Sequence, residues 1–200
     1  MNYLLPASRT RVRWGFAALL VMTLISFTSV ASATVMRFAD LIMLVEISDT
    51  IVQGKVVKET FLKEKDSGDV VTRTEIEVSR TFLGKTQKTI VFQQWGGIMD
   101  GRTSGVPGDA RFEIGEEVVL FLHTAKKEPG LFLSALGQSK YRVIRDGKNV
   151  NVWRNLDDMA FLVEGVTPTK LQAKEDERLG YDSFVAELES LIAAVKGDSK

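Results

Sequence analysis

Alternation of apolar and polar side chains is clearest between Val70 and Phe82. Even-numbered positions in this segment are mostly apolar or threonine, and odd-numbered positions are mostly charged or polar. A period of two separates the side chains onto two faces, so the segment predicts a strand with one buried and one solvated face. Residues 118–122 instead form an unbroken apolar run, Val-Val-Leu-Phe-Leu, which is typical of a central strand.

Shorter patterns predict further strands at residues 50–57, 88–95, 131–136, 140–145 and 149–153. Gly54 interrupts the first of them and indicates a bulge or a close approach of another backbone. Asp146-Gly147 separates the last two and predicts a hairpin turn.

Helical spacing occurs on either side of these strands. Residues 37–47 predict a short, largely buried helix that Ser48-Asp49 ends. Residues 164–181 are polar and predict a loop or a frayed helix. Apolar residues then recur at helical spacing from Asp182 or Ser183 to Gly197, which predicts an amphipathic C-terminal helix.

Six or seven short strands with a helix at each end predict a mainly β protein. We expect a small antiparallel OB-like barrel with a short N-terminal helix and a C-terminal amphipathic helix. An immunoglobulin-like sandwich is the alternative. The barrel domain is expected to span residues 34–163, and residues 164–200 to form a polar linker and a helix packed on the barrel.

The first 33 residues predict a Sec signal peptide. Three arginines, at positions 9, 11 and 13, precede 17 uncharged residues, and Ala31-Ser32-Ala33 has the small-x-small pattern that signal peptidase accepts. We expect cleavage after Ala33 and a periplasmic or extracellular protein without membrane attachment. A retained anchor is the alternative, since 17 residues lie at the lower limit for a spanning helix.

Composition limits the chemistry. The chain has 26 basic and 26 acidic residues, and removal of the three N-terminal arginines leaves 23 basic and 26 acidic residues, a net charge of −3. This balance argues against nucleic acid as a partner. The absence of cysteine and the single histidine exclude disulfides, cysteine-based zinc sites, iron–sulfur clusters and multi-histidine metal sites. We therefore expect no cofactor and no metal.

Two groups of residues suggest catalysis or cation binding, and each has a simpler interpretation. His123 follows the central strand, but no nucleophile elbow accompanies it, so a structural histidine is favoured over a catalytic one. Acidic residues gather in and after the glycine-rich segment, where a solvated acidic loop is favoured over a calcium site: Asp100, Asp109, Glu113, Glu116 and Glu117. We assign no catalytic residue.

The segment from Gly96 to Asp109 is the strongest functional candidate. Five glycines and one proline predict a long irregular loop, and loops of this length are typically functional or disordered. The alternative is that its apolar side chains cap one end of the barrel. The candidate binding residues are Trp95, Ile98, Met99, Asp100, Arg102 and Val106.

The order of elements resembles a family of uncharacterised secreted bacterial proteins over about residues 34–145. The similarity is carried by turn glycines and strand patterns, including Gly54, Phe82-Leu-Gly84, Gly96-Gly97, Gly105-Val-Pro-Gly108 and Phe112-Glu-Ile-Gly115. Some members of that family carry a matrixin-type metalloprotease domain after this module. This chain has no His-Glu-x-x-His helix, so the resemblance implies the non-catalytic part alone.

The expected architecture is also similar to the tissue-inhibitor/netrin-like barrels, which are secreted OB folds that block metalloproteases. In those inhibitors an N-terminal cysteine chelates the target's zinc, whereas this chain has no cysteine. The analogy therefore implies a fold and no inhibitory mechanism.

Together these patterns predict an exported, non-enzymatic binding module. Its partner would be an envelope or extracellular protein or polymer, and regulation of a secreted protease is the sharper form of the hypothesis. A hydrolase that uses His123 or the loop carboxylates is one alternative. A structural envelope component is the other.

Overall fold

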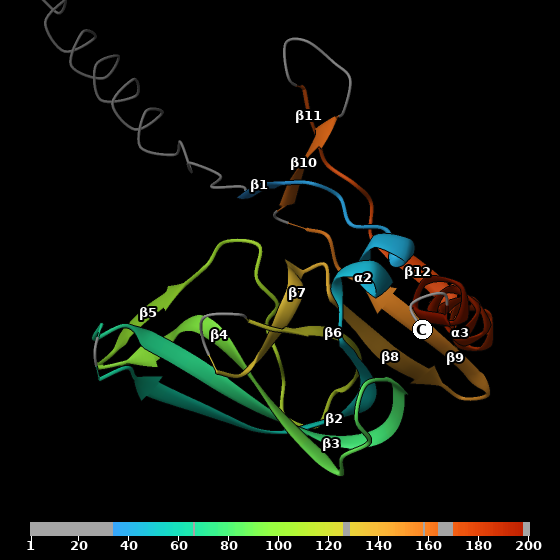
Figure 1. The fold of residues 1–200 in the computed structure, drawn as a ribbon. Helices are drawn as coiled ribbons and strands as arrows, with labels where there is room; N and C mark the ends of the chain where they lie inside the picture. The colour runs from blue at the N-terminus through green and yellow to red at the C-terminus, as the bar shows by residue number, and fades with distance from the viewer. Residues whose placement is uncertain (1–33, 66, 126–128, 158, 164–169, 198–200) are drawn as a thin grey trace, which may run out of the picture. The chain divides into compact units, whose positions relative to one another are not determined.

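The computed structural model describes residues 34–65, 67–125, 129–157, 159–163 and 170–197. The protein is mainly β, with a short N-terminal and a longer C-terminal helix (Figure 1). Its elements in chain order are β1 (Thr34–Met36), α2 (Leu41–Ile47), β2 (Thr50–Lys63), β3 (Val70–Leu83), β4 (Thr89–Met99), β5 (Arg102–Gly105), β6 (Glu117–Thr124), β7 (Leu131–Gly137), β8 (Lys140–Asp146), β9 (Asn149–Arg154), β10 (Met159–Val163), β11 (Lys170–Gln172), β12 (Glu177–Gly180) and α3 (Tyr181–Gly197).

Five strands close into a barrel, as predicted. β2 pairs with β3 and β6, β3 pairs with β4, and β7 pairs with both β4 and β6. The β4–β7 pair is parallel and the other four are antiparallel. This ring is an OB-like barrel, and it excludes the immunoglobulin-like sandwich.

The central strand β6 is buried on both faces. Its residues Val118, Leu120 and Leu122 lie in the barrel core, together with Phe92 and Ile76. On its other face, Val119 and Phe121 belong to a second core, which also contains α2, α3, β8 and β9 residues. Burial on both faces explains why this segment is a continuous apolar run.

β8, β9 and β12 extend the sheet from β6 beyond the barrel. The predicted hairpin between β8 and β9 is confirmed, since Asp146 pairs with Asn149. Figure 1 shows α2 and α3 together beside β8 and β9. Phe184, Val185 and Leu188 are the buried positions of α3.

The predicted irregularity at Gly54 is confirmed. The β2–β3 register shifts between Gln53 and Gly54. A Cβ at Gly54 would collide with the carbonyl oxygen of Glu77 and would lie 2.5 Å from Cγ2 of Ile76. Glycine is needed here because the partner strand approaches too closely for any side chain.

The predicted N-terminal helix is shorter than expected. It begins at Leu41 because Asp40 is its N-cap: Oδ1 of Asp40 accepts a hydrogen bond of 2.9 Å from the amide of Met43. Residues 37–40 lie before the helix, and Phe38 packs on Phe161 of β10 instead. Phe38 contributed to the apolar spacing that predicted an earlier start, but its side chain contacts β10 and it does not belong to the helix.

The expected irregular loop at residues 96–109 is wrong for residues 96–105, while residues 106–109 lie outside any strand. β4 continues to Met99 and forms a hairpin with β5, in which Gly96 pairs with Gly105 and Met99 with Arg102. Gly96 has a φ of 97° and packs directly on the backbone of β5. The glycines that indicated a loop therefore allow close pairing of two strands.

Strands also occur in regions expected to be irregular. Within the polar segment after residue 163, β11 pairs with β10 and β12 pairs with β9, so a loop or frayed helix is wrong there. β1 pairs in parallel with β10. These strands have three to five residues each, too short to show a period of two.

The described residues form one compact unit. Among the described residues, no helix is long and apolar enough to cross a bilayer. The signal peptide and the cleavage motif at Ala31 and Ala33 lie outside the described residues and stay predictions.

Candidate functional site

A cleft of about 300 Å³ lies on the outer face of the barrel. Phe92 and Leu133 point into the barrel core, so their strand neighbours Gln93 and Phe132 point outward. We call this site the Trp95 cleft. Its walls come from the β2–β3 turn, β3, β4 and the start of β7: Glu64, Ser67, Val71, Arg73, Gln93, Gln94, Trp95, Pro129 and Phe132.

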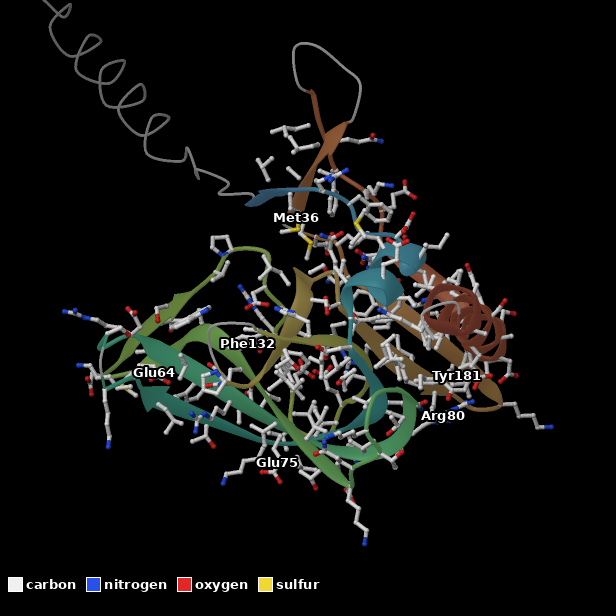
Figure 2. The ribbon with its side chains drawn as sticks, in the orientation of Figure 1. Met36, Glu64, Glu75, Arg80, Phe132 and Tyr181 are labelled. Atoms are coloured by element: carbon white, nitrogen blue, oxygen red, sulfur yellow. The ribbon has the colours of Figure 1, made fainter. Side chains whose placement is uncertain are left out.

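The strand register aligns the floor of the cleft. Arg73 of β3 pairs with Gln93 of β4, and Gln93 pairs with Phe132 of β7. Figure 2 labels Phe132 on β7, and Glu64 at the β2–β3 end of the barrel. Residues from distant parts of the chain therefore meet in one row across three strands.

Hydrogen bonds order the polar part of this row. Nε of Arg73 donates to Oε1 of Gln93 at 3.3 Å, and Nε2 of Gln93 donates to the carbonyl of Pro129 at 3.0 Å. A Cβ at Gly130 would collide with Nε2 of Gln93, so glycine leaves room for this contact. The carbonyl of Pro129 thus orients the amide of Gln93, and that amide in turn accepts the hydrogen bond from Nε of Arg73.

Arg73 carries a positive charge that no described carboxylate neutralises by an ion pair. Its single hydrogen bond uses Nε, which leaves the two terminal guanidinium nitrogens without a protein partner among the described residues. An ordered guanidinium in this state is suited to bind an anion from outside.

Two aromatic side chains line the same cleft as Arg73. Trp95 is 41% exposed and lies opposite Val71 at the end of the β3–β4 ladder. Phe132 is half-buried. Together they offer apolar ring faces beside the polar floor.

Of the six candidate binding residues, only Trp95 lines this cleft. Ile98, Met99, Asp100 and Arg102 lie on the β4–β5 hairpin, where Ile98 is 55% exposed. Val106 lines a different cavity. The structure therefore separates residues that are neighbours in sequence.

The second cavity has a volume of about 430 Å³ and lies between residues 106–116 and the strands β8 to β10. We call it the Trp153 cleft. Its lining includes Val106, Asp109, Glu116, Lys140 and Trp153.

The expectation of a solvated acidic loop is wrong for Glu116, whose side chain is 2% exposed. Its Oε1 lies 2.7 Å from Nζ of Lys140, which also packs over the ring of Phe112. Burial lowers the pKa of Lys140, while Glu116 opposes that shift. Lys140 comes from β8, so sequence alone did not reveal the partner.

Asp109 is half-buried, and burial raises its pKa. Its Oδ1 accepts a hydrogen bond of 2.8 Å from the amide of Ala110. Within the described ranges, no three Asp, Glu or His side chains come together in a way that could hold a metal ion. The carboxylates of Asp109 and Glu116 instead make contacts within the protein that order the backbone between β5 and β6.

His123 lies in β6 opposite Phe132, with ring centroids 6.1 Å apart. Its Nδ1 is buried and has no hydrogen-bond partner, and no described carboxylate orients the ring. A general base of the serine-hydrolase type needs such an orienting group. The described residues around His123 do not supply one.

The sequence patterns did not single out Arg73, Gln93 or Phe132. Arg73 and Gln93 are outward positions of predicted strands, where polar residues are ordinary. Only the pairing of β3, β4 and β7 reveals that they share a cleft with Trp95.

No protein-family model matches this chain, and no curated protein matches it in sequence.

Proposed function

We propose that the protein is an exported, non-enzymatic binding module that holds part of an envelope or extracellular protein or polymer in the Trp95 cleft. One observation carries this proposal. Arg73, which has no ion pair with any described carboxylate, lines one cleft together with two partly exposed aromatic side chains, Trp95 and Phe132.

The composition of the cleft supports a binding role. Ligand sites are typically concave and combine apolar walls with a few well-placed polar groups. In other OB folds, the outer face beside the corresponding loops binds oligonucleotides or oligosaccharides. That analogy concerns the fold, so the assignment depends on the Trp95 cleft itself.

Site-specific crosslinking tests the proposal. A photoreactive amino acid would replace Trp95 in the full-length chain, and the control would replace Leu179 of β12, which has a similar exposure of 40% against 41%. Irradiation of intact cells should yield a discrete adduct from position 95 and none from position 179.

A second variant adds Arg73→Gln to the position-95 probe. We expect the adduct to weaken, because the charged group beside the probe is lost. No adduct from position 95, or equal adducts from both positions, would contradict a binding role for the cleft.

A further inference from the structure

We infer that the Trp95 cleft recognises a carboxylated sugar, as part of an acidic polysaccharide such as a polymer of hexuronic acid. This inference rests on the proposed function and names its ligand class.

The first argument is the state of Arg73. Its Nε is bound to Gln93, and Gln93 is in turn anchored on the carbonyl of Pro129. No described residue occupies the terminal nitrogens, which can donate two parallel hydrogen bonds, the geometry that matches a carboxylate. The hydrogen bond at Nε restrains one edge of the guanidinium, which reduces the side-chain entropy lost when an anion binds.

The second argument is the charge around the cleft. Among the residues that the structure describes, the lining contains one cation, Arg73, and one carboxylate, Glu64. Binding of a nucleic-acid backbone depends on several cations that follow successive phosphates. The guanidinium of Arg73, as the cation of the described lining, fits one carboxylate per binding subsite better than it fits a phosphate chain.

The third argument separates a sugar from an extended peptide. A peptide that adds to a sheet needs a strand with a free edge. Beneath the cleft, Arg73 pairs with Thr60 and Gln93, and Gln93 pairs with Arg73 and Phe132. The backbone of Arg73 and Gln93 is therefore paired on both sides, so this row offers side chains to a ligand.

The remaining lining suits a sugar ring. Trp95 and Phe132 present apolar faces to the C–H face of a pyranose. Gln94, Ser67 and Glu64 supply amide, hydroxyl and carboxylate groups that can pair with sugar hydroxyls. The cleft volume of about 300 Å³ lies at the lower end of the range for ligand sites.

Affinity electrophoresis of the full-length protein tests the inference with matched polymers. The probes are polygalacturonate and the neutral polymer obtained by reducing its carboxyl groups. We expect binding to polygalacturonate that weakens about tenfold or more when the carboxyl groups are reduced. Arg73→Gln should cause a similar loss.

Lys58→Gln is the matched control. Lys58 is an exposed cation on β2 that does not line the cleft, so this variant removes the same charge and should bind as the unmodified protein does. Arg73→Lys keeps the charge but loses the two-pronged geometry, and we expect intermediate binding. Gln93→Glu should also weaken binding, because a fixed carboxylate would neutralise Arg73.

Equal binding of the acidic and neutral polymers, no binding of either, or equal losses from Arg73→Gln and Lys58→Gln would overturn the inference. Preferential binding of a peptide through its C-terminal carboxylate would also overturn it. In each case a discrete adduct from the photoreactive residue at position 95 would leave the binding role in place, so the two failures are distinguishable.

Discussion

Arg154 illustrates how a single residue can connect distant segments. It is the largest fully buried side chain among the described residues. Its Nε donates to the carbonyl of Gln138 at 2.9 Å, and Nη2 donates to the carbonyl of Ala39 at 2.5 Å. Nη1 lies 3.1 Å from Oε2 of Glu177. The guanidinium thereby joins the N-terminal segment, the β7–β8 turn and β12.

Replacing Arg154 should strongly destabilise the fold. Arg154→Met leaves two buried carbonyls and one carboxylate without their donor, so we expect a loss of about 3 kcal/mol in the free energy of unfolding. Urea denaturation measures this loss in the free energy of unfolding. Arg178→Met, at an exposed position on β12, should change stability by less than about 0.5 kcal/mol. Similar effects of the two variants would contradict the assigned role of Arg154.

Glu117 gives a pH-dependent contribution to stability. Arg145 donates two hydrogen bonds of 2.8 Å to its carboxylate and thereby lowers the pKa of Glu117. Because the folded pKa lies below the unfolded one, the stabilisation is present above the unfolded pKa. It is lost as pH falls through the folded pKa.

Glu117→Gln should therefore be less stable than the unmodified protein near neutral pH, with the difference shrinking at acid pH. Denaturant titrations at about pH 7 and about pH 3, on either side of the ordinary glutamate pKa, measure the change. A difference that stays constant between the two pH values would refute this contribution.

At the scale of elements, strands with a clear pattern could be predicted and strands without one could not. The alternation in β3 and the apolar run of β6 both reflect burial, which a local pattern records. β5 is exposed at every position, so no alternation marks it. β4 looked like a loop after Trp95 because glycine is shared by loops and by closely paired strands.

The β2–β3 bulge provides a test at this scale. Gly54→Ala places a methyl group against the carbonyl of Glu77 and the side chain of Ile76. We expect a loss of about 1–3 kcal/mol in the free energy of unfolding, as in overpacked cores. Gly105→Ala is the control, since a Cβ there meets no atom within 4 Å.

Thermal or urea unfolding compares the two glycine variants. Gly105→Ala should remain within about 0.5 kcal/mol of the unmodified protein. If Gly54→Ala proved equally harmless, the close approach of β3 to β2 would not be as tight as the structure has it.

At the scale of the whole molecule, the sequence predicted the barrel but not the site. Barrel closure depends on the parallel β4–β7 pair, which joins residues almost 40 positions apart, Phe92 with Leu131 and Gln93 with Phe132. No local pattern encodes such a pairing. Trp95 was identified because it stands at the entrance of the predicted glycine-rich loop, whereas Arg73 and Gln93 became candidates only when the closed barrel placed them in the same cleft.

The two clefts can be distinguished by their tryptophans. Trp95 lines the smaller cleft, and Trp153 lines the larger one, where its Nε1 donates to Asp176 at 3.0 Å. Each indole N–H gives its own NMR signal, so a titration with ligand reports on each cleft separately.

The central claim is that ligand binds in the Trp95 cleft. NMR titration of ¹⁵N-labelled full-length protein with oligogalacturonate tests it most directly. We predict that the indole signal of Trp95, assigned from the Trp95→Phe variant, shifts and saturates while that of Trp153 stays in place. A saturable shift at Trp153 alone, or no shift at either indole, would contradict the claim.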